Sequence, residues 1–396
     1  MKNSSSVNLP IGIALLPIIF LVLLLSINVF IYGDDSLNGT NQFILILSGL
    51  FGASIGFIYK VSYKDILTSI SNSVKSVTGA LLILLFVGAL AGTWMISGII
   101  PSMVYYGLKI LDPNIFLPAC IIICSIISVA TGSSWTTSAT VGIALVGIGQ
   151  ALGISAGMVG GAVISGAYFG DKLSPLSDTT NLAAAVTKVD LFKHIKYLTY
   201  TTIPSITITF IVFIILGFLQ VSDGSTDNTY LLSAISEKFN ISLVLFIVPL
   251  IVLIMIIKKT PPLIALVIGT LTGALFSIIF QPQIISELSS DSNSKLVNTY
   301  VVIMDTITGP ISIETNNELL NDLFSTGGML GMLNTIFLVI GTMVFGGVMD
   351  AIGALKTISK TLLKWANTSF KLFASTVASC LALNVSASDQ YLSIVV

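Results

Sequence analysis

Long apolar runs separated by short polar stretches fill the chain from about residue 10 onward. An α-helix needs about 20 apolar residues to cross the hydrocarbon core of a bilayer. Runs of this kind predict spanning helices at Pro10–Tyr32, Gln42–Tyr59, Val77–Ile100, Tyr197–Leu219, Ile241–Ile257, Leu263–Phe280 and Leu330–Met349. The pattern therefore predicts an all-α polytopic membrane protein.

Other stretches depart from this simple pattern. The less regular apolar runs are Ile115–Ala130, Ala139–Leu152 and Gly157–Gly170. Shorter amphipathic pieces, which we expect at the membrane interface, are Asp65–Lys75, Ser102–Leu111 and Leu355–Trp365. The first apolar run is longer than a signal-peptide core and is followed by no small-x-small cleavage site, so it is interpreted as the first spanning helix.

The composition supports a membrane protein and narrows its partners. Of the 396 residues, 54% are hydrophobic and only 9% are charged, whereas soluble chains carry about 25% charged residues. The net charge of −1 and the lack of a basic patch predict no nucleic-acid partner. All basic residues are Lys, and without Arg the usual bidentate carboxylate clamp is missing, which disfavours an organic-anion substrate. The cysteines Cys120, Cys124 and Cys380 lie in apolar runs and are expected to be small core residues.

Lysines and acids occupy different loops. Lysine clusters lie at residues 60–75, 188–196, 258–259 and 356–371, and the mostly acidic loops at Asp34–Asp35, Asp223–Glu237 and Glu287–Asp322. Because a lysine excess marks cytoplasmic loops, the N-terminus is predicted to be cytoplasmic and the acidic loops external. The segment Ile115–Leu152 must then leave and return on the outer side, as a re-entrant hairpin.

Two halves of the chain show a similar order of elements. Gly92-Thr93 with Gly98 resembles Gly341-Thr342 with Gly346 and Gly347, and an apolar run with a polar tip follows each, at Thr131–Ser138 and Asn384–Gln390. Opposite approach of the two tips is typical of inverted-topology repeats, whose broken helices hold the substrate near the midplane. We predict a complete first repeat at 1–222 and a second, inverted repeat at 223–396 that is incomplete at its C-terminus.

The segment Gly160–Leu182 is the most polar break in an apolar region. Ionisable groups in a bilayer are costly and usually functional, and irregular backbone at that depth survives only where it is buried or lines a cavity. Pro175 and the Gly and Ser content argue against a continuous helix between Asp171 and Asp178. We predict an unwound ion site whose oxygens come from Ser177, Asp178, Thr179 and Asn181, and whose carboxylate binds Na⁺ or H⁺ but never both.

Structural alternatives stand beside this hypothesis. Asp178 would cap a short helix and Asp171 would pair with Lys172 at an interface, or Lys172 would be an internal counter-charge. In the first tip, hydroxyls on both sides of Trp135, including Ser134 and Thr136, would face the ion; the alternative is an ordinary N-cap for the following helix. In the second tip, Asp389 is a third intramembrane acid, with Asn384 beside it.

Enzymatic and ATP-driven functions find no support in the sequence. The one histidine, His194, lies between Lys193 and Lys196, so a zinc or His-based catalytic site is not expected. The Gly170-Asp171 pair has no Tyr-Asp partner of the kind that intramembrane aspartyl proteases need. There is no phosphate-binding P-loop. We expect a protein that is not an enzyme and has no cofactor.

Three motifs carry a family resemblance. TGSSWTTSATVGIALVGIG (Thr131–Gly149) and ISGAYFGDKLSPLSDTTNLAAAV (Ile164–Val186) closely resemble the NhaC-type Na⁺/H⁺ antiporter family, and NVSASDQYLSIV (Asn384–Val395) is similar to its second-half motif. The resemblance implies a bacterial inner-membrane secondary antiporter with re-entrant hairpins, interrupted helices and a further C-terminal portion. The motif positions are Gly132, Ser134, Trp135, Gly170, Asp171, Ser174, Pro175, Ser177, Asp178, Thr179, Thr180, Asn181 and Asp389.

The predicted function is exchange of cytoplasmic Na⁺ (or Li⁺) for external H⁺ by alternating access. Asp178 is the first choice for the shared carboxylate and Asp171 the second. Further ion-binding positions are Thr179, Asn181, Ser177, Ser134, Thr136 and Asp389. The expected partners are Na⁺, H⁺ and the lipid bilayer, with a homodimer as the protein partner to test. The alternatives are a malate-2H⁺/Na⁺-lactate antiporter, since the family includes such exchangers, and a non-transporting fragment or scaffold.

Overall fold

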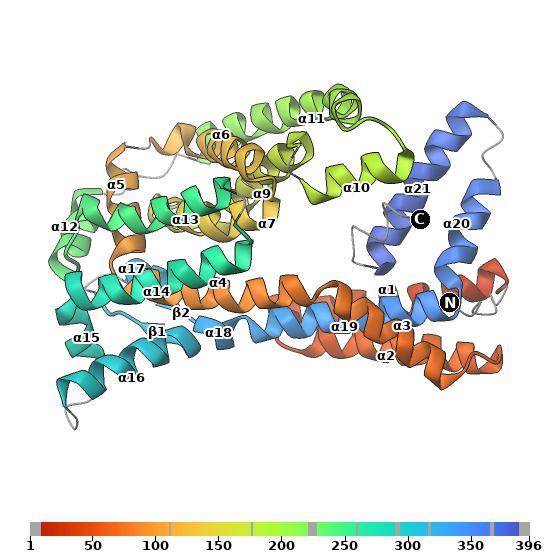
Figure 1. Ribbon diagram of the computed structural model, residues 1–396, viewed down its shortest axis with the longest axis horizontal. Coiled ribbons are helices and arrows are strands. Elements are labelled where there is room, and N and C mark those ends of the chain that lie inside the picture. Colours follow the sequence, from red (N-terminus) through yellow and green to blue (C-terminus); the bar gives the residue numbers. More distant parts are fainter. Residues whose placement is uncertain are drawn as a thin grey trace. The chain divides into compact units, whose positions relative to one another are not determined.

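The computed structural model describes residues 9–110, 112–175, 177–220, 228–258, 260–289, 294–315, 318–364 and 368–387. Helices make up most of this part of the chain, and β-structure is confined there to one two-stranded ladder (Figure 1). The chain forms two compact units, one of residues Met1–Leu81 with Leu333–Val396 and one of Leu82–Met332. Each unit is described by itself.

The first unit joins both ends of the chain. Its elements are α1 (Ile11–Tyr32), the 3₁₀ turn η1 (Gly33–Leu37), α2 (Thr40–Ile58), α3 (Tyr63–Ser76), α19 (Leu333–Ala351), α20 (Ala354–Lys364) and α21 (Ser369–Ala387). Small residues of α19 let it approach its neighbours closely, because a Cβ on Gly347 would lie 2.6 Å from the Ile70 Cα atom of α3. Phe345 and Met349 of the same helix are buried in the core of this unit.

The second unit is larger and contains the predicted ion site. Its helices are α4 (Thr78–Ile96, whose first turn belongs to the first unit), α5 (Ile99–Ile110), α6 (Pro113–Thr131), α7 (Ser134–Thr137), the π-helix η2 (Ser138–Gly142), α8 (Ile143–Ala151), α9 (Ala156–Leu173), α10 (Asp178–Thr187), α11 (Leu191–Gln220), α12 (Asn228–Lys238), the 3₁₀ turn η3 (Leu243–Phe246), α13 (Ile247–Ile257), α14 (Pro262–Phe280), α15 (Pro282–Leu288), α16 (Lys295–Thr308), α17 (Glu318–Leu323) and α18 (Gly328–Gly331). The strands β1 (Ile311–Ser312) and β2 (Ser325–Thr326) pair antiparallel, with Ile311 opposite Thr326.

Close backbone contact holds the middle of this unit together. Gly92 of α4 lies against the Thr306 carbonyl of α16, and Gly88 lies against the Gly328 carbonyl, so a side chain at either glycine would collide with backbone. Cys120 and Cys124 of α6 are fully buried in the core, as expected of small core residues. The side chain of Cys380 lies outside the described residues.

The helices confirm an all-α polytopic membrane protein. Within the described residues, seven helices are long and apolar enough to cross a membrane: Ile11–Tyr32, Thr40–Ile58, Thr78–Ile96, Pro113–Ala130, Leu191–Leu219, Pro262–Phe280 and Leu333–Ala351. The predicted span Ile241–Ile257 is instead part of a helix pair, Leu231–Lys238 and Leu243–Ile256, that bends by 84°. Counted as one broken span or re-entrant loop, this pair raises the number to eight.

One amphipathic segment is more buried than expected. Ser102–Leu111 was expected at the interface, and α5 packs in the core of the second unit, where Val104 is fully buried; its depth in the membrane stays a prediction. The cause of this burial is Gly107, whose missing side chain makes room for Ile148 of α8. The predicted repeat boundary between residues 222 and 223 concerns the order of elements rather than contacts, so the two compact units do not test it and it stays a prediction.

Candidate functional site

The site begins with the packing of α6 against α9. Gly166 of α9 lies beside Cys124, and Gly170, one turn later, lies beside Ser128, so the two helices run in the same direction. A Cβ on Gly170 would come within 2.6 Å of the Ser128 Cβ atom and 2.7 Å of the Val129 backbone nitrogen. Only glycine permits this approach, which brings the ends of both helices to one place.

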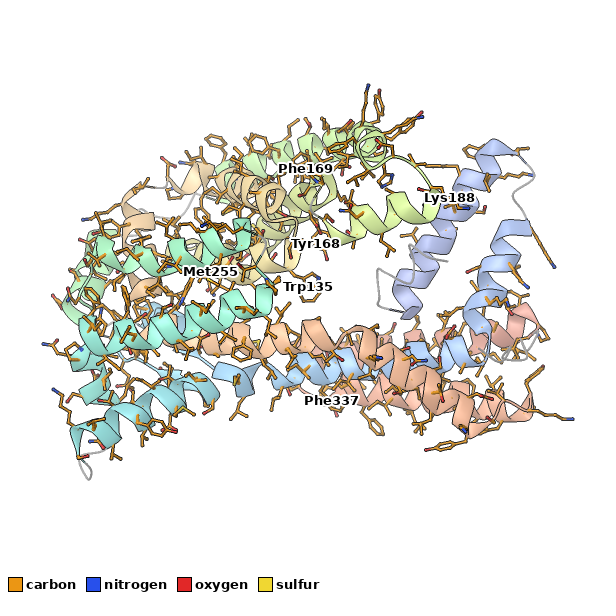
Figure 2. The ribbon with its side chains drawn as sticks, in the orientation of Figure 1. Trp135, Tyr168, Phe169, Lys188, Met255 and Phe337 are labelled. Atoms are coloured by element: carbon orange, nitrogen blue, oxygen red, sulfur yellow. The ribbon has the colours of Figure 1, made fainter. Side chains whose placement is uncertain are left out.

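The polar tip after α6 is built around a left-handed glycine. Gly132 has φ of +69° and caps α6, with its N–H donated to the Ser128 carbonyl. The chain then turns into α7, which carries Ser134 and Trp135, and Figure 2 labels Trp135 there and Tyr168 and Phe169 on α9. Ser134 is 2% exposed and Trp135 is 45% exposed, so the serine side chain faces the protein interior.

One hydrogen bond joins the tip to the polar break. The Ser134 hydroxyl donates to Oδ2 of Asp171 over 2.9 Å. Asp171 lies in the last turn of α9 and is only 8% exposed. The structure thus brings together one predicted residue from each of two separate motifs, at the meeting point of the helix ends.

The predicted helix break is present between α9 and α10. Helix α9 ends at Leu173 and α10 begins at Asp178, with Ser174 as the C-cap of α9. Its hydroxyl donates to the Val129 carbonyl of α6 over 2.8 Å. Pro175 follows directly, and a proline has no N–H with which to continue the helix.

The Ser177 side chain caps α10. The Ser177 Oγ atom accepts the Thr180 N–H over 3.3 Å, which is the N-cap arrangement. Asp178 is the first residue of α10, and its side chain lies outside the described part of the chain. The cap hydroxyl also lies 3.0 Å from the Thr179 hydroxyl.

The remaining polar side chains of the break bind its backbone. The Thr180 hydroxyl donates to the Lys172 carbonyl over 3.3 Å. The Asn181 amide nitrogen donates to the carbonyls of Ser177 and Pro175 over 2.7 and 2.9 Å. These bonds join the side chains of α10 to the backbone on both sides of the break, and the Ser177 carbonyl accepts the Asn181 backbone N–H as well, over 3.0 Å. They therefore fix the shape of the break, and of these two side chains only Thr180 is buried.

Lys172 does not neutralise Asp171. Its side chain is exposed, whereas the neighbouring carboxylate is buried, and the one ion pair found in the described part of the chain joins Lys238 to Glu287. The structural alternative to the ion site, in which Asp171 pairs with Lys172, is therefore not found in the structure. A buried carboxylate without a cationic partner is costly, and the Ser134 hydroxyl is the one partner that the described residues give the Asp171 carboxylate.

A cavity of about 370 Å³ lies in the same unit as the Ser134–Asp171 pair. Its walls come from α4, α5, η2, α8, α9 and the α17–β2 segment. One of its polar lining residues, Ser138, follows Ser134 by one helical turn. The π-helix η2, which begins at Ser138, was not predicted. Such segments are rare and are frequent at functional sites, but the sequence carries no pattern that distinguishes one from an α-helix.

Some predicted site residues are not tested by the structure. Thr136 and Asn384 lie in α7 and α21, but their side chains are outside the described residues, and Asp389 lies wholly outside them. The wall formed by Leu323, Ser325 and Thr326 was missed, because the sequence showed only an acidic loop there.

Comparison with known proteins agrees with the motifs. Residues 166–396, which include the helix break, match the Na⁺/H⁺ antiporter family. A malate-2H⁺/Na⁺-lactate antiporter of Bacillus subtilis (strain 168) is 37% identical over 379 residues, 95% of this chain and 76% of the relative. The Na⁺/H⁺ antiporter NhaC of Alkalihalophilus pseudofirmus is 34% identical over 350 residues, 88% of this chain and 73% of the relative. The arginine/ornithine antiporter ArcD of Halobacterium salinarum is 33% identical over 391 residues, 97% of this chain and 76% of the relative. With more than half of its length matched and these relatives similar over most of it, the chain belongs to the Na⁺/H⁺ antiporter family.

Proposed function

We propose that this protein exchanges cytoplasmic Na⁺ (or Li⁺) for external H⁺ across a bacterial inner membrane, with its N-terminus in the cytoplasm. The observation that carries the proposal is the buried Asp171 carboxylate, which has the Ser134 hydroxyl as its partner and no cationic side chain paired with it among the described residues. Family membership and the similarity to NhaC antiporters support the choice of ions. The protein moves ions and catalyses no chemical reaction.

Exchange follows from a site with two alternative occupants. With a proton bound, Asp171 is neutral and can remain buried at low cost. With the proton released, a dehydrated Na⁺ takes its place and is coordinated by the carboxylate and neighbouring oxygens, for which Ser134 and the carbonyls at the end of α9 are the nearest sources. Because one carboxylate cannot hold both cations, each return to the opposite side carries the other ion.

We choose Asp171 over Asp178 as the first candidate for the shared carboxylate, because its contacts are described. Asp171 joins the tip to the break through Ser134. Because Ser177 caps α10, Asp178 is not needed for that role. We therefore keep Asp178 in the proposal as a second ion ligand. Thr179, Asn181 and Ser177 belong to the same break and would supply neutral oxygens as the break rearranges.

The test is Asp171→Asn in everted vesicles, with sodium-induced proton movement as the readout. We expect exchange to fall below about 1% of wild type, because an amide cannot carry the exchanged proton. The matched control is Asp350→Asn. The Asp350 carboxylate also accepts a hydrogen bond from a serine hydroxyl, that of Ser69, over 2.9 Å, but its side chain is exposed. Near-normal exchange by Asp171→Asn, with the control also active, would remove Asp171 from the central role.

A second candidate is exchange of malate and protons for sodium and lactate, favoured by the similarity to the Bacillus subtilis antiporter of that name. The lack of Arg and of a cationic side chain beside Asp171 speaks against it. Uptake of labelled malate driven by a lactate gradient distinguishes the two, since a Na⁺/H⁺ exchanger shows none. Because another relative is the arginine/ornithine antiporter ArcD, labelled arginine is the third substrate to test in the same vesicles.

A further inference from the structure

The cavity beside the site lies toward one end of the helices that build it. Gln150 at the end of α8 and Gly160 near the start of α9 both line it, while Ser134 and Asp171 lie at the opposite ends of this helix pair. Ile164 is the lining residue of α9 closest in sequence to Asp171. Seven residues of helix separate the two, which is about 10 Å along the axis. The cavity therefore stops short of the carboxylate, on the side of the α8–α9 turn.

The chemistry of the walls suits a hydrated cation. The polar lining groups are all neutral, namely Ser138, Gln150, Ser325 and Thr326, and the remaining walls are apolar. At about 30 Å³ per molecule, the volume holds on the order of ten waters, enough for a cation with its first hydration shell. An organic dicarboxylate would find no cationic side chain on these described walls.

The segment from α17 to β2 forms one wall of the cavity. Leu323 of α17 lies 3.4 Å from the position of a Cβ on Gly147 of α8. The next residue, Phe324, is fully buried, stacks edge-on against Phe239 with ring centroids 5.1 Å apart, and accepts the Ile313 N–H over 3.1 Å. Leu323 is thus held at the wall by an anchored neighbour and by the β1–β2 ladder (Figure 1).

We propose that this cavity is the hydrated vestibule that connects Asp171 with the acidic-loop side, through which the cation leaves the site, and that Leu323 is its gate. The inference rests on the proposed function, because it assigns an access path to the same site. The π-helix η2 follows Ser134 along the chain and forms part of the vestibule wall through Ser138 and Gly142, and such segments are frequent at functional sites. Rearrangement at η2 passes the cation from Asp171 into the vestibule, and opening at Leu323 releases it to the acidic-loop side.

Cysteine labelling tests the vestibule without depending on transport. In a background with Cys120, Cys124 and Cys380 changed to Ala, Gly160→Cys places a thiol in open space, because nothing lies within 4 Å of its Cβ position. The matched control, Gly161→Cys, lies one residue along the same helix but points at the Phe213 ring of α11, 3.4 Å away. Intact cells are treated with membrane-impermeant methanethiosulfonates, one cationic and one anionic.

We expect the cationic reagent to modify Gly160→Cys at least tenfold faster than Gly161→Cys, and faster than the anionic reagent does. Adding Leu323→Ala should raise the Gly160→Cys rate a further several-fold and leave the control unchanged. Equal rates at the two positions would overturn the vestibule, even with exchange intact. A faster anionic reagent would overturn its assignment to cations. The expected labelling in a protein without sodium-induced proton movement would uphold the vestibule and reject the proposed function.

Discussion

At the scale of single residues, the hydrogen bond between Ser134 and Asp171 is the contact on which the proposed function depends most. Both side chains are buried, and the donor comes from a different helix and a different motif. Hydrogen bonds to charged groups contribute about 1.5–3 kcal/mol, which corresponds to roughly a 10- to 150-fold change in an equilibrium constant. Loss of the Ser134 hydroxyl should therefore change cation binding at Asp171 by an amount that can be measured.

Ser134→Ala should lower the apparent affinity for Na⁺ by about tenfold, because the charged carboxylate loses its one described donor. Ser134→Thr keeps a hydroxyl and should restore most of that affinity. The measurement is the sodium dependence of proton movement in everted vesicles. Ser165→Ala is the control, since Ser165 donates only to the Gly161 carbonyl of its own helix. An unchanged sodium dependence in Ser134→Ala would show that the bond has no part in ion binding.

At the scale of elements, the contact between α6 and α9 positions both halves of the site. Gly170→Ala would place a methyl group within 2.7 Å of α6 backbone. Overpacking of this kind costs about 1–3 kcal/mol. We expect a melting temperature several degrees lower in detergent and a loss of exchange. Gly157→Ala in the same helix, where nothing lies within 4 Å, should melt like the wild type. Equal melting of the two variants would mean that the helices can separate freely.

The elements also show where sequence reasoning succeeds. Apolar length predicted the spans of α1, α2, α14 and α19 to within a few residues, because a bilayer-crossing helix has a length requirement that the sequence displays directly. The break after α9 was predicted as well, since Pro175 and the surrounding Ser and Gly oppose a helix. Burial of α5 and the bend before α13 were missed, because both depend on neighbours that lie far away in the sequence.

At the scale of the whole molecule, the sequence predicted the residue types of the site better than their roles. Motif spacing singled out Asp171, Asp178 and Ser134, but the burial of Asp171 and its bond to Ser134 follow from tertiary contacts. The inverted repeat and the second tip remain predictions, since Asp389 lies outside the described residues. The direction of transport can be stated only when the orientation of the protein in the membrane is known.

Orientation is predicted by the lysine-rich and acidic loops, and two exposed positions test it. In the same cysteine-free background, Asp35→Cys in η1 should react with an impermeant thiol reagent added to intact cells, because acidic loops are expected outside. Lys193→Cys at the start of α11 should react only after the membrane is permeabilised. Both side chains are exposed, so a difference in reactivity reports sidedness rather than burial. The reverse pattern would place the N-terminus outside and turn the vestibule toward the cytoplasm, so that it would take up Na⁺ rather than release it.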